Sequence, residues 1–186
     1  MVRQPSRFPK RKRVFIGAEG ESERSLAKLL GTLCDEQGLS FYLDIVVCGG
    51  GDSLAVTEHA VRKYRRRERL YGHFSTGWIL LDYDRLEQDM KSGRNPKPKA
   101  DAENLKLVYL KPNIEGVLLR FHPGQEKQLP AANNAERKLR KFWPEYRKPA
   151  SAEKLRKRFT TEDIRRAARH DSGLRWILEK LTLWDG

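Results

Sequence analysis

The chain has 186 residues and a formal net charge of +13, and this length suffices for one domain with a helical appendage. Hydrophobic residues make up 38% and charged residues 34%, a composition that excludes an intrinsically disordered chain. The positive excess favours a polyanionic partner: nucleic acid, an anionic membrane or the ribosome. A solvated basic surface without a ligand is the alternative interpretation.

Cysteine usage and hydropathy exclude further classes. Cys34 and Cys48 are the only cysteines and form no CxxC pair, which argues against a zinc site. No apolar stretch approaches the roughly 18 residues that span a bilayer. The basic start of the chain leads into no signal-peptide core. These features predict a cytoplasmic protein with no membrane partner.

The first two thirds of the chain alternate between strand-like and helix-like patterns. Residues 1–12 are predicted as a basic flexible arm and residues 13–124 as an α/β domain. Short apolar runs predict strands over 13–18, 41–48, 77–81 and 106–110. Helical periodicity and stop signals predict helices over 22–36, 53–67, 84–90, 101–105 and 113–120. This alternation indicates a mostly parallel sheet of about four strands flanked by helices.

Residues 125–186 are predicted as a basic helical extension. Apolar spacing predicts helices over 135–142, 152–159 and 161–183, and Thr160 followed by Asp163 is typical of a helix start. Trp176 and Trp184 are expected in the hydrophobic core.

The basic face of this extension is expected to bind nucleic acid, because Lys and Arg neutralise phosphates and exposed aromatic rings stack on bases. Trp143, Tyr146 and Phe159 are interleaved with the basic residues. The alternative places these aromatics in a small core, with the basic residues on its wet face. The residues expected to contact nucleic acid are Arg11, Lys12, Arg137, Lys141, Lys154, Arg156, Lys157 and Arg158.

Acidic residues follow two of the predicted strands. Glu19 comes directly after the run 14–18, and Asp82 and Asp84 come after the run 78–81. Ligands of open α/β sheets bind beyond the carboxyl ends of the strands, and residues i and i+2 of an extended segment point the same way. Converging carboxylates repel one another unless a cation neutralises them, and Mg²⁺ prefers oxygen ligands. If the two strands are neighbours, the sequence predicts a metal site there.

More ordinary roles exist for the acids around these positions. Glu21 and Glu23 suit the N-terminus of the following helix, and an Asp-x-Asp sequence is common in loops. Glu115, after the fourth predicted strand, is either a further acid at the same edge or a solvent-facing helix residue. Gly49, Gly50 and Gly51 either present backbone N–H groups to a phosphate or form a tight turn capped by Asp52 or Ser53.

Four motifs in this order resemble the Toprim domain, and more closely its RloB-like branch. The likeness covers roughly residues 13–122. The last motif departs from the family pattern, because Pro112 precedes Asn113, Val117 replaces a Trp, and the following His is displaced to His122. The motifs are Glu19-Gly20-Glu21-Ser22-Glu23, Gly49-Gly50-Gly51-Asp52, Asp82-Tyr83-Asp84 and Asn113-Ile114-Glu115-Gly116-Val117-Leu118-Leu119.

The resemblance implies Mg²⁺ or Mn²⁺ at the acid cluster and phosphodiester chemistry. Glu19, Asp82 and Asp84 are then the expected catalytic and metal-binding residues, with Glu115 as a ligand to a second ion. The resemblance further implies a nuclease that cleaves DNA or RNA in phage defence by abortive infection, with a partner ATPase as a candidate. A non-catalytic nucleic-acid- or ribosome-binding protein on a Toprim scaffold is the main alternative. A receiver-like phosphoacceptor domain using Lys111 is a weaker one.

Overall fold

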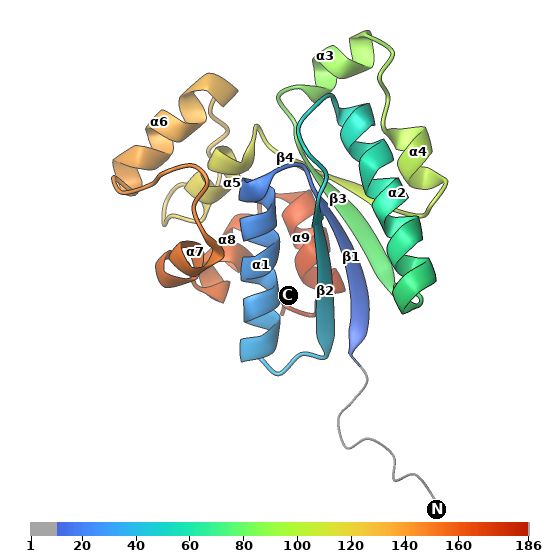
Figure 1. The fold of residues 1–186 in the computed structure, drawn as a ribbon. Helices are drawn as coiled ribbons and strands as arrows, with labels where there is room; N and C mark the ends of the chain where they lie inside the picture. Colours follow the sequence, from blue (N-terminus) through green and yellow to red (C-terminus); the bar gives the residue numbers. More distant parts are fainter. Residues whose placement is uncertain (1–10, 186) are drawn as a thin grey trace, which may run out of the picture.

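A four-stranded parallel sheet with the strand order β2-β1-β3-β4 forms the centre of the protein, with helices on both faces (Figure 1). It is seen in a computed structural model that describes residues 11–185. The predicted α/β class is therefore confirmed. Most of the predicted arm, residues 1–10, lies outside the described residues. The strands are β1 (Lys12–Ala18), β2 (Phe41–Val47), β3 (Thr76–Asp82) and β4 (Lys106–Leu110).

The helices divide between the two faces of the sheet. Helices α2 and α4 cover one face, α3 lies beside the N-terminal end of α2, and the other helices lie on the opposite face (Figure 1). Within residues 11–185, no helix is both long and apolar enough to cross a membrane. The helices are α1 (Glu21–Glu36), α2 (Ser53–Tyr71), α3 (Leu86–Lys91), α4 (Lys97–Asp101), α5 (Ile114–Arg120), α6 (Ala132–Phe142), α7 (Ala152–Arg158), α8 (Thr161–Ala168) and α9 (Ser172–Lys180).

The two central strands, β1 and β3, are apolar along most of their length because both of their faces are buried. Phe15 and Ile79 point to the α2 side, whereas Ile16, Trp78 and Leu80 point to the α1 side. A side chain of this size contributes about 1.5–3 kcal/mol when it is fully buried. Continuous apolar runs of this kind are typical of parallel sheets covered on both sides.

The helical extension shares the hydrophobic core of the sheet. Leu139, Leu155, Ile164 and Ile177 are buried in the same cluster as Leu30 of α1. The predicted boundary at residue 124 falls in the turn region between α5 and α6. Because no separate core is formed, the extension is fixed in place against α1 and α5.

Two helix predictions were wrong. The single helix expected over 161–183 is divided, since Asp171 caps α9 by accepting a hydrogen bond from the Leu174 N–H at 2.9 Å. The turn expected over 101–105 lies instead at α4, where Pro98 occupies the first helical turn, a position that suits its fixed φ. The predicted start of α8 is confirmed, because Thr160 and Asp163 form a reciprocal cap.

Candidate functional site

Glu19 and Asp82 lie side by side at the carboxyl edge of the sheet. The strands β1 and β3 are neighbours, and Ala18 pairs with Leu80, so the residues after both strands meet. The Glu19 Oε2 atom accepts a hydrogen bond from the Asp82 N–H at 3.1 Å. The Asp82 Oδ1 atom accepts one from the N–H of Ile114, the first residue of α5, at 3.0 Å. Each carboxylate is thus held through one oxygen, and the other makes no hydrogen bond within residues 11–185.

Asp84 lies at the rim of this pair. Its side chain is exposed, and its backbone N–H donates to the Pro112 carbonyl at 2.9 Å, which fixes the loop after β3. Its negative charge contributes to raising the pKa of both Glu19 and Asp82. The structure therefore brings Glu19 and Asp82 together, with Asp84 near enough to affect both electrostatically but outside the depression that they line.

Glu23 also belongs to this cluster, although the sequence assigned it only a capping role. That role is present, because its Oε2 atom accepts a hydrogen bond from the Gly20 N–H at 2.8 Å at the start of α1. Glu23 is nevertheless buried beside the other acids. Burial raises its pKa, and the charge of Glu19 adds to this effect. The neighbouring Glu21 instead forms an exposed ion pair with Arg24.

The electrostatics of the cluster are dominated by burial. Burial, followed by the charges of Glu23, Glu19 and Asp84, raises the pKa of Asp82 to about 8. Burial is also the largest cause of the raised pKa of Glu19, and the Asp82 N–H and Arg85 oppose it. Acids that resist ionisation in this way gain from a nearby cation.

Lys148, which the sequence analysis left out of the site, provides a cation from the extension. Its Nζ atom lies 3.0 Å from Oε1 of Glu115, and the same oxygen accepts a hydrogen bond from the Tyr146 hydroxyl at 3.0 Å. Burial lowers the pKa of Lys148, but Glu115, Asp82 and Glu23 raise it by more. Glu115 is buried, and its role as a ligand to a second ion stays a prediction.

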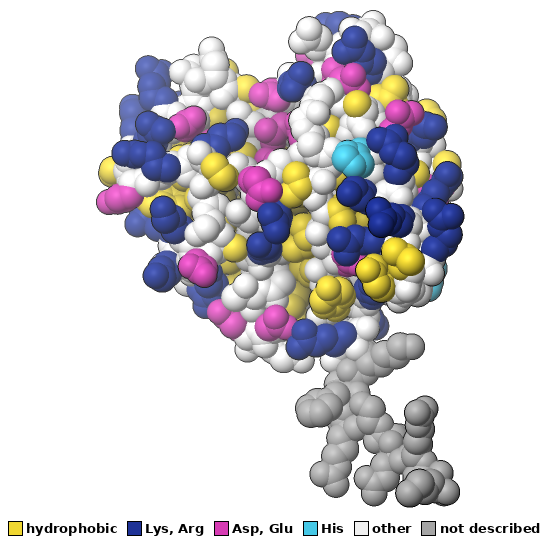
Figure 2. Space-filling view, in the orientation of Figure 1, with side chains coloured by type: hydrophobic (Ala, Val, Ile, Leu, Met, Phe, Trp, Pro, Cys, Tyr) yellow, Lys and Arg dark blue, Asp and Glu magenta, His cyan; other side chains and the backbone are white. Residues whose placement is uncertain are grey.

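These groups surround a depression of about 320 Å³ at the sheet edge. In Figure 2 acidic side chains gather in the hollow between the parts that carry α6 and α3, with Lys and Arg on both flanks. The hollow thus combines a negative centre with positive margins. The residues that line the depression are Glu19, Gly20, Glu21, Ser22, Glu23, Gly50, Asp82, Lys148 and Pro149.

The glycine loop after β2 forms the tight turn that was one of its two predicted forms. Gly49 and Gly51 have positive φ angles of 81° and 151°. Asp52 caps α2 by accepting the Ala55 N–H at 2.8 Å, and Asp89 of α3 accepts the Ser53 N–H at 2.8 Å. Two carboxylates therefore already occupy the helix N-terminus where the alternative interpretation placed a phosphate. Gly50 lines the acidic depression.

The predicted nucleic-acid-binding residues fall into two groups. Arg11 pairs with Asp35 at 3.1 Å, and Arg156 pairs with Glu36 at 2.8 Å, so these two charges are partly neutralised. Lys12 extends over the ring of Phe41. The remaining five are exposed on the extension: Arg137, Lys141, Lys154, Lys157 and Arg158.

The aromatics interleaved with those residues belong to the core. Trp143, Tyr146 and Phe159 are buried, so the expectation that they stack on bases was wrong and the core alternative holds. His122 is also buried, with its ring centroid 5.1 Å from that of Phe159. Trp176 and Trp184, both expected in the core, are only partly buried and pack against it.

The carboxylates suit a hard divalent cation by their chemistry. Within residues 11–185 no three His, Cys, Asp or Glu side chains are grouped closely enough to form a complete set of ligands. Mg²⁺, however, is commonly bound by one or two carboxylates together with water and substrate phosphates. The free oxygens of Glu19 and Asp82 meet that requirement.

The chain matches no protein-family model, curated protein or solved structure. Its resemblance to the Toprim and RloB-like proteins therefore depends on the four sequence motifs alone.

Proposed function

We propose that this protein is a divalent-metal-dependent nuclease that cleaves phosphodiester bonds in DNA or RNA. The observation that supports this most is the contact of Glu19 with Asp82 at the carboxyl edge of adjacent parallel strands. Burial, with the neighbouring carboxylates adding to it, raises the pKa of both acids, and such shifts are common at functional sites.

Mg²⁺ or Mn²⁺ would be held by Glu19, Asp82 and Asp84. A bound ion of this type stabilises charge on a phosphate and generates hydroxide from water. The backbone hydrogen bonds from Asp82 and Ile114 keep the first two carboxylates in place. Glu19, whose pKa is raised mainly by burial, would act as the general base or acid, or as a further ligand of the ion.

Lys148 would help to bind the scissile phosphate in this proposal. It is the basic side chain that lines the acidic depression within the described residues, and its side chain is 49% exposed. An ammonium at this place attracts a phosphate that the surrounding carboxylates would otherwise repel. The exposed basic residues of the extension would hold the adjoining phosphates, so binding should weaken steeply with salt.

The biological setting is proposed on the motif resemblance alone. The protein would act in the cytoplasm in phage defence by abortive infection. An ATPase of the same defence system is a candidate partner.

Cleavage assays test the proposal. Purified protein is incubated with plasmid DNA and with RNA, in EDTA, Mg²⁺ or Mn²⁺. Cleavage should require the metal and fall at least about 100-fold in Asp82→Asn, while nucleic-acid binding is kept. Glu87→Gln, at an exposed acid of α3, is the matched control and should cleave as the wild type does. Metal-independent cleavage, or cleavage unchanged in Asp82→Asn, would overturn the proposal.

A second candidate is a nucleic-acid-binding protein without catalysis. The observation that favours it is the position of Lys148, which already neutralises part of the acid cluster. Binding that is indifferent to metal, with no cleavage of either substrate, would favour this candidate.

A further inference from the structure

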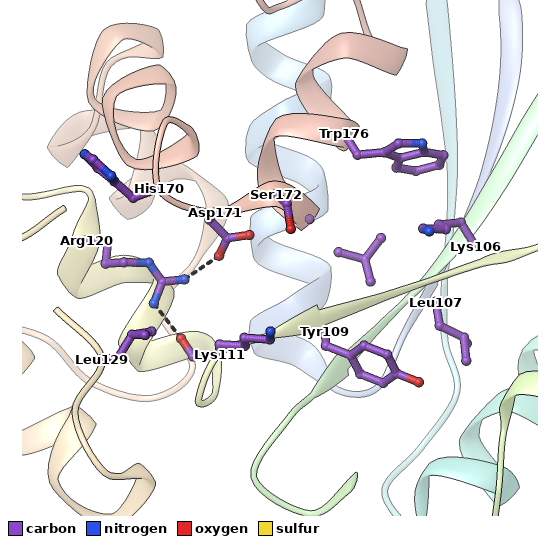
Figure 3. A pocket seen from close by; sticks show the side chains of 12 residues that line it. Lys106, Leu107, Tyr109, Lys111, Arg120, Leu129, His170, Asp171, Ser172 and Trp176 are labelled. Atoms are coloured by element: carbon purple, nitrogen blue, oxygen red, sulfur yellow. Dashed lines mark hydrogen bonds and ion pairs between the residues drawn. The ribbon is translucent and has the colours of Figure 1, made fainter. Parts of the chain in front are cut away.

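A second cavity, of about 470 Å³, lies against β4, at the edge of the sheet. It extends between β4 and the N-terminal end of α9. Its lining includes Lys106 and Tyr109 of β4, Lys111 just after the strand, and Trp176 of α9. Figure 3 shows the amino groups of Lys106 and Lys111 pointing toward the middle of the cavity, and the rings of Tyr109 and Trp176 on opposite sides of β4.

Contacts connect this cavity with the acid cluster. Tyr83, between Asp82 and Asp84 in the chain, is 41% exposed. Its ring centroid lies 6.0 Å from that of Tyr109, and the Lys111 Nζ atom lies 5.0 Å from its centroid. Tyr109 and Lys111 in turn line the cavity. Tyr83, Lys111 and Tyr109 therefore connect Asp84 to the α2 face of β4, and the surface continues around the edge of this strand to Lys106 and Trp176 on the opposite face.

The charge in the cavity is unbalanced. Lys106 and Lys111 take no part in the ion pairs formed within residues 11–185, whereas Arg13, Arg67 and Arg120 do. The carboxylate of Asp171 is directed to Arg120, as the dashed line in Figure 3 marks. Lys180 lies over the Trp176 ring, with its Nζ atom 5.7 Å from the centroid. Two ammonium groups are thus available to an anionic ligand.

Arg120 closes one wall of the cavity. It is 2% exposed, and its guanidinium donates to the Lys111 carbonyl and to the Asp171 carboxylate. Its Nε–H has no hydrogen-bond partner within the described residues, and the Nε atom cannot be reached from the cavity. The charge that the cavity offers to an anion therefore comes from Lys106 and Lys111.

We infer that a single strand of nucleic acid lies along this surface, with bases stacked on Tyr83, Tyr109 and Trp176 and phosphates bound by Lys111 and Lys106. Stacking on aromatic rings beside a basic groove is how proteins hold single strands, and a duplex would hide its base faces from these rings. The inference deepens the proposed function, and it depends on it only for the direction of the strand toward Asp82 and Asp84. We name the residues Tyr83, Lys106, Tyr109, Lys111 and Trp176 the β4 track.

Fluorescence anisotropy in EDTA measures this binding without cleavage. The probes are labelled 12-nucleotide oligo-dT and oligo-U, with a hairpin duplex of equal length as competitor. The wild type should prefer either single strand to the duplex by about tenfold or more. Replacing both lysines, Lys106→Gln with Lys111→Gln, should weaken binding at least tenfold. It should also reduce the salt slope by about 1.4, since each phosphate contact on a single strand contributes about 0.7.

The rings are tested with matched controls. Tyr109→Ala and Trp176→Phe should each weaken binding of the single strands several-fold, and Trp176→Phe keeps an aromatic ring against Trp78 so that the fold is preserved. Tyr42→Ala, at a 53% exposed tyrosine on the opposite edge strand, and Lys28→Gln, on the exposed face of α1, should bind as the wild type does. A difference between oligo-dT and oligo-U would assign the strand as DNA or RNA.

Equal affinity for duplex and single strand, or unchanged binding in the Lys106→Gln, Lys111→Gln variant, would overturn the inference that a single strand binds along the β4 track. If that happened while Asp82→Asn still abolished cleavage, the nuclease would stand without the track. Loss of binding in the track variants, in a protein that cleaves nothing, would support the track and reject the nuclease.

Discussion

The Lys148 ammonium, from the helical extension, lies 3.0 Å from the buried carboxylate of Glu115 at the start of α5. This contact joins the extension to the acidic edge of the sheet, because Asp82 and Glu23 also interact with the same ammonium. The extension therefore takes part in the electrostatics of the site.

Removing this ammonium with Lys148→Met should destabilise the protein. Glu115 is 2% exposed and would keep only the Tyr146 hydroxyl as a partner for its charge. Since the Lys148 side chain is half exposed, we expect a loss of about 1–3 kcal/mol in the free energy of unfolding, measured by urea titration at pH 7.

The double variant Lys148→Met with Glu115→Gln should recover much of that loss, since it removes both charges together. Additive losses in the double variant would contradict the pairing.

Asp82→Asn should stabilise the metal-free protein increasingly as the pH rises from 4 to 8. The folded protein holds the Asp82 proton up to a pKa of about 8, whereas an unfolded aspartate releases it near pH 4. Between these values the folded state binds more protons, so the stability contributed by this group falls with rising pH. Urea midpoints in EDTA at pH 5 and pH 8 measure the effect.

The difference between Asp82→Asn and the wild type should exceed 1 kcal/mol, approximately, at pH 8 and be clearly smaller at pH 5. Glu87→Gln is the control, because Glu87 is exposed and its pKa is lowered mainly by its hydrogen bond with Lys91. An equal difference at the two pH values would show that Asp82 is not held in its protonated form.

His122→Phe should stabilise the protein in acid. Burial, with the charge of Arg158 also contributing, lowers the pKa of His122 to about 4. An unfolded histidine takes up a proton near pH 6.5, so stability from this group is lost as the pH falls from 6.5 toward 4. His122→Phe has no titrating group at this position and so does not lose stability in this way. The phenylalanine ring would remain packed against Phe159.

Thermal unfolding at pH 5 and pH 7.5 gives the comparison. The advantage of His122→Phe over the wild type should grow by about 2 kcal/mol at the lower pH. An advantage that does not change with pH would show that folding does not lower the pKa of His122.

Sequence reasoning anticipated the parallel sheet and the position of the acids, because both follow from local patterns. Apolar runs ending in Glu19 and in Asp82 carry their own boundaries, and parallel topology brings such ends to one edge. The division of α8 from α9 was not anticipated. Helical periodicity in the sequence continues through Asp171. In the structure Asp171 instead caps α9 by accepting the Leu174 N–H and forms an ion pair with Arg120, and these contacts separate α8 from α9.

Lys148 and the β4 track could not be found in the same way. In the sequence Lys148 resembles every other basic residue of the extension. It lies 33 positions from Glu115 in the chain, and only the fold brings the two into contact. Trp176 differs from Trp143 only in its tertiary surroundings, which expose part of one ring and bury the other.

In the proposed function, Glu19, Asp82 and Asp84 bind one divalent cation. Crystals soaked in Mn²⁺ and measured at the manganese absorption edge test it most directly. We predict an anomalous peak between the free oxygens of Glu19 and Asp82, within reach of Asp84 and absent from Asp82→Asn crystals. Crystals of the wild type with no peak at this edge of the sheet, or with the peak retained in Asp82→Asn, would contradict the account.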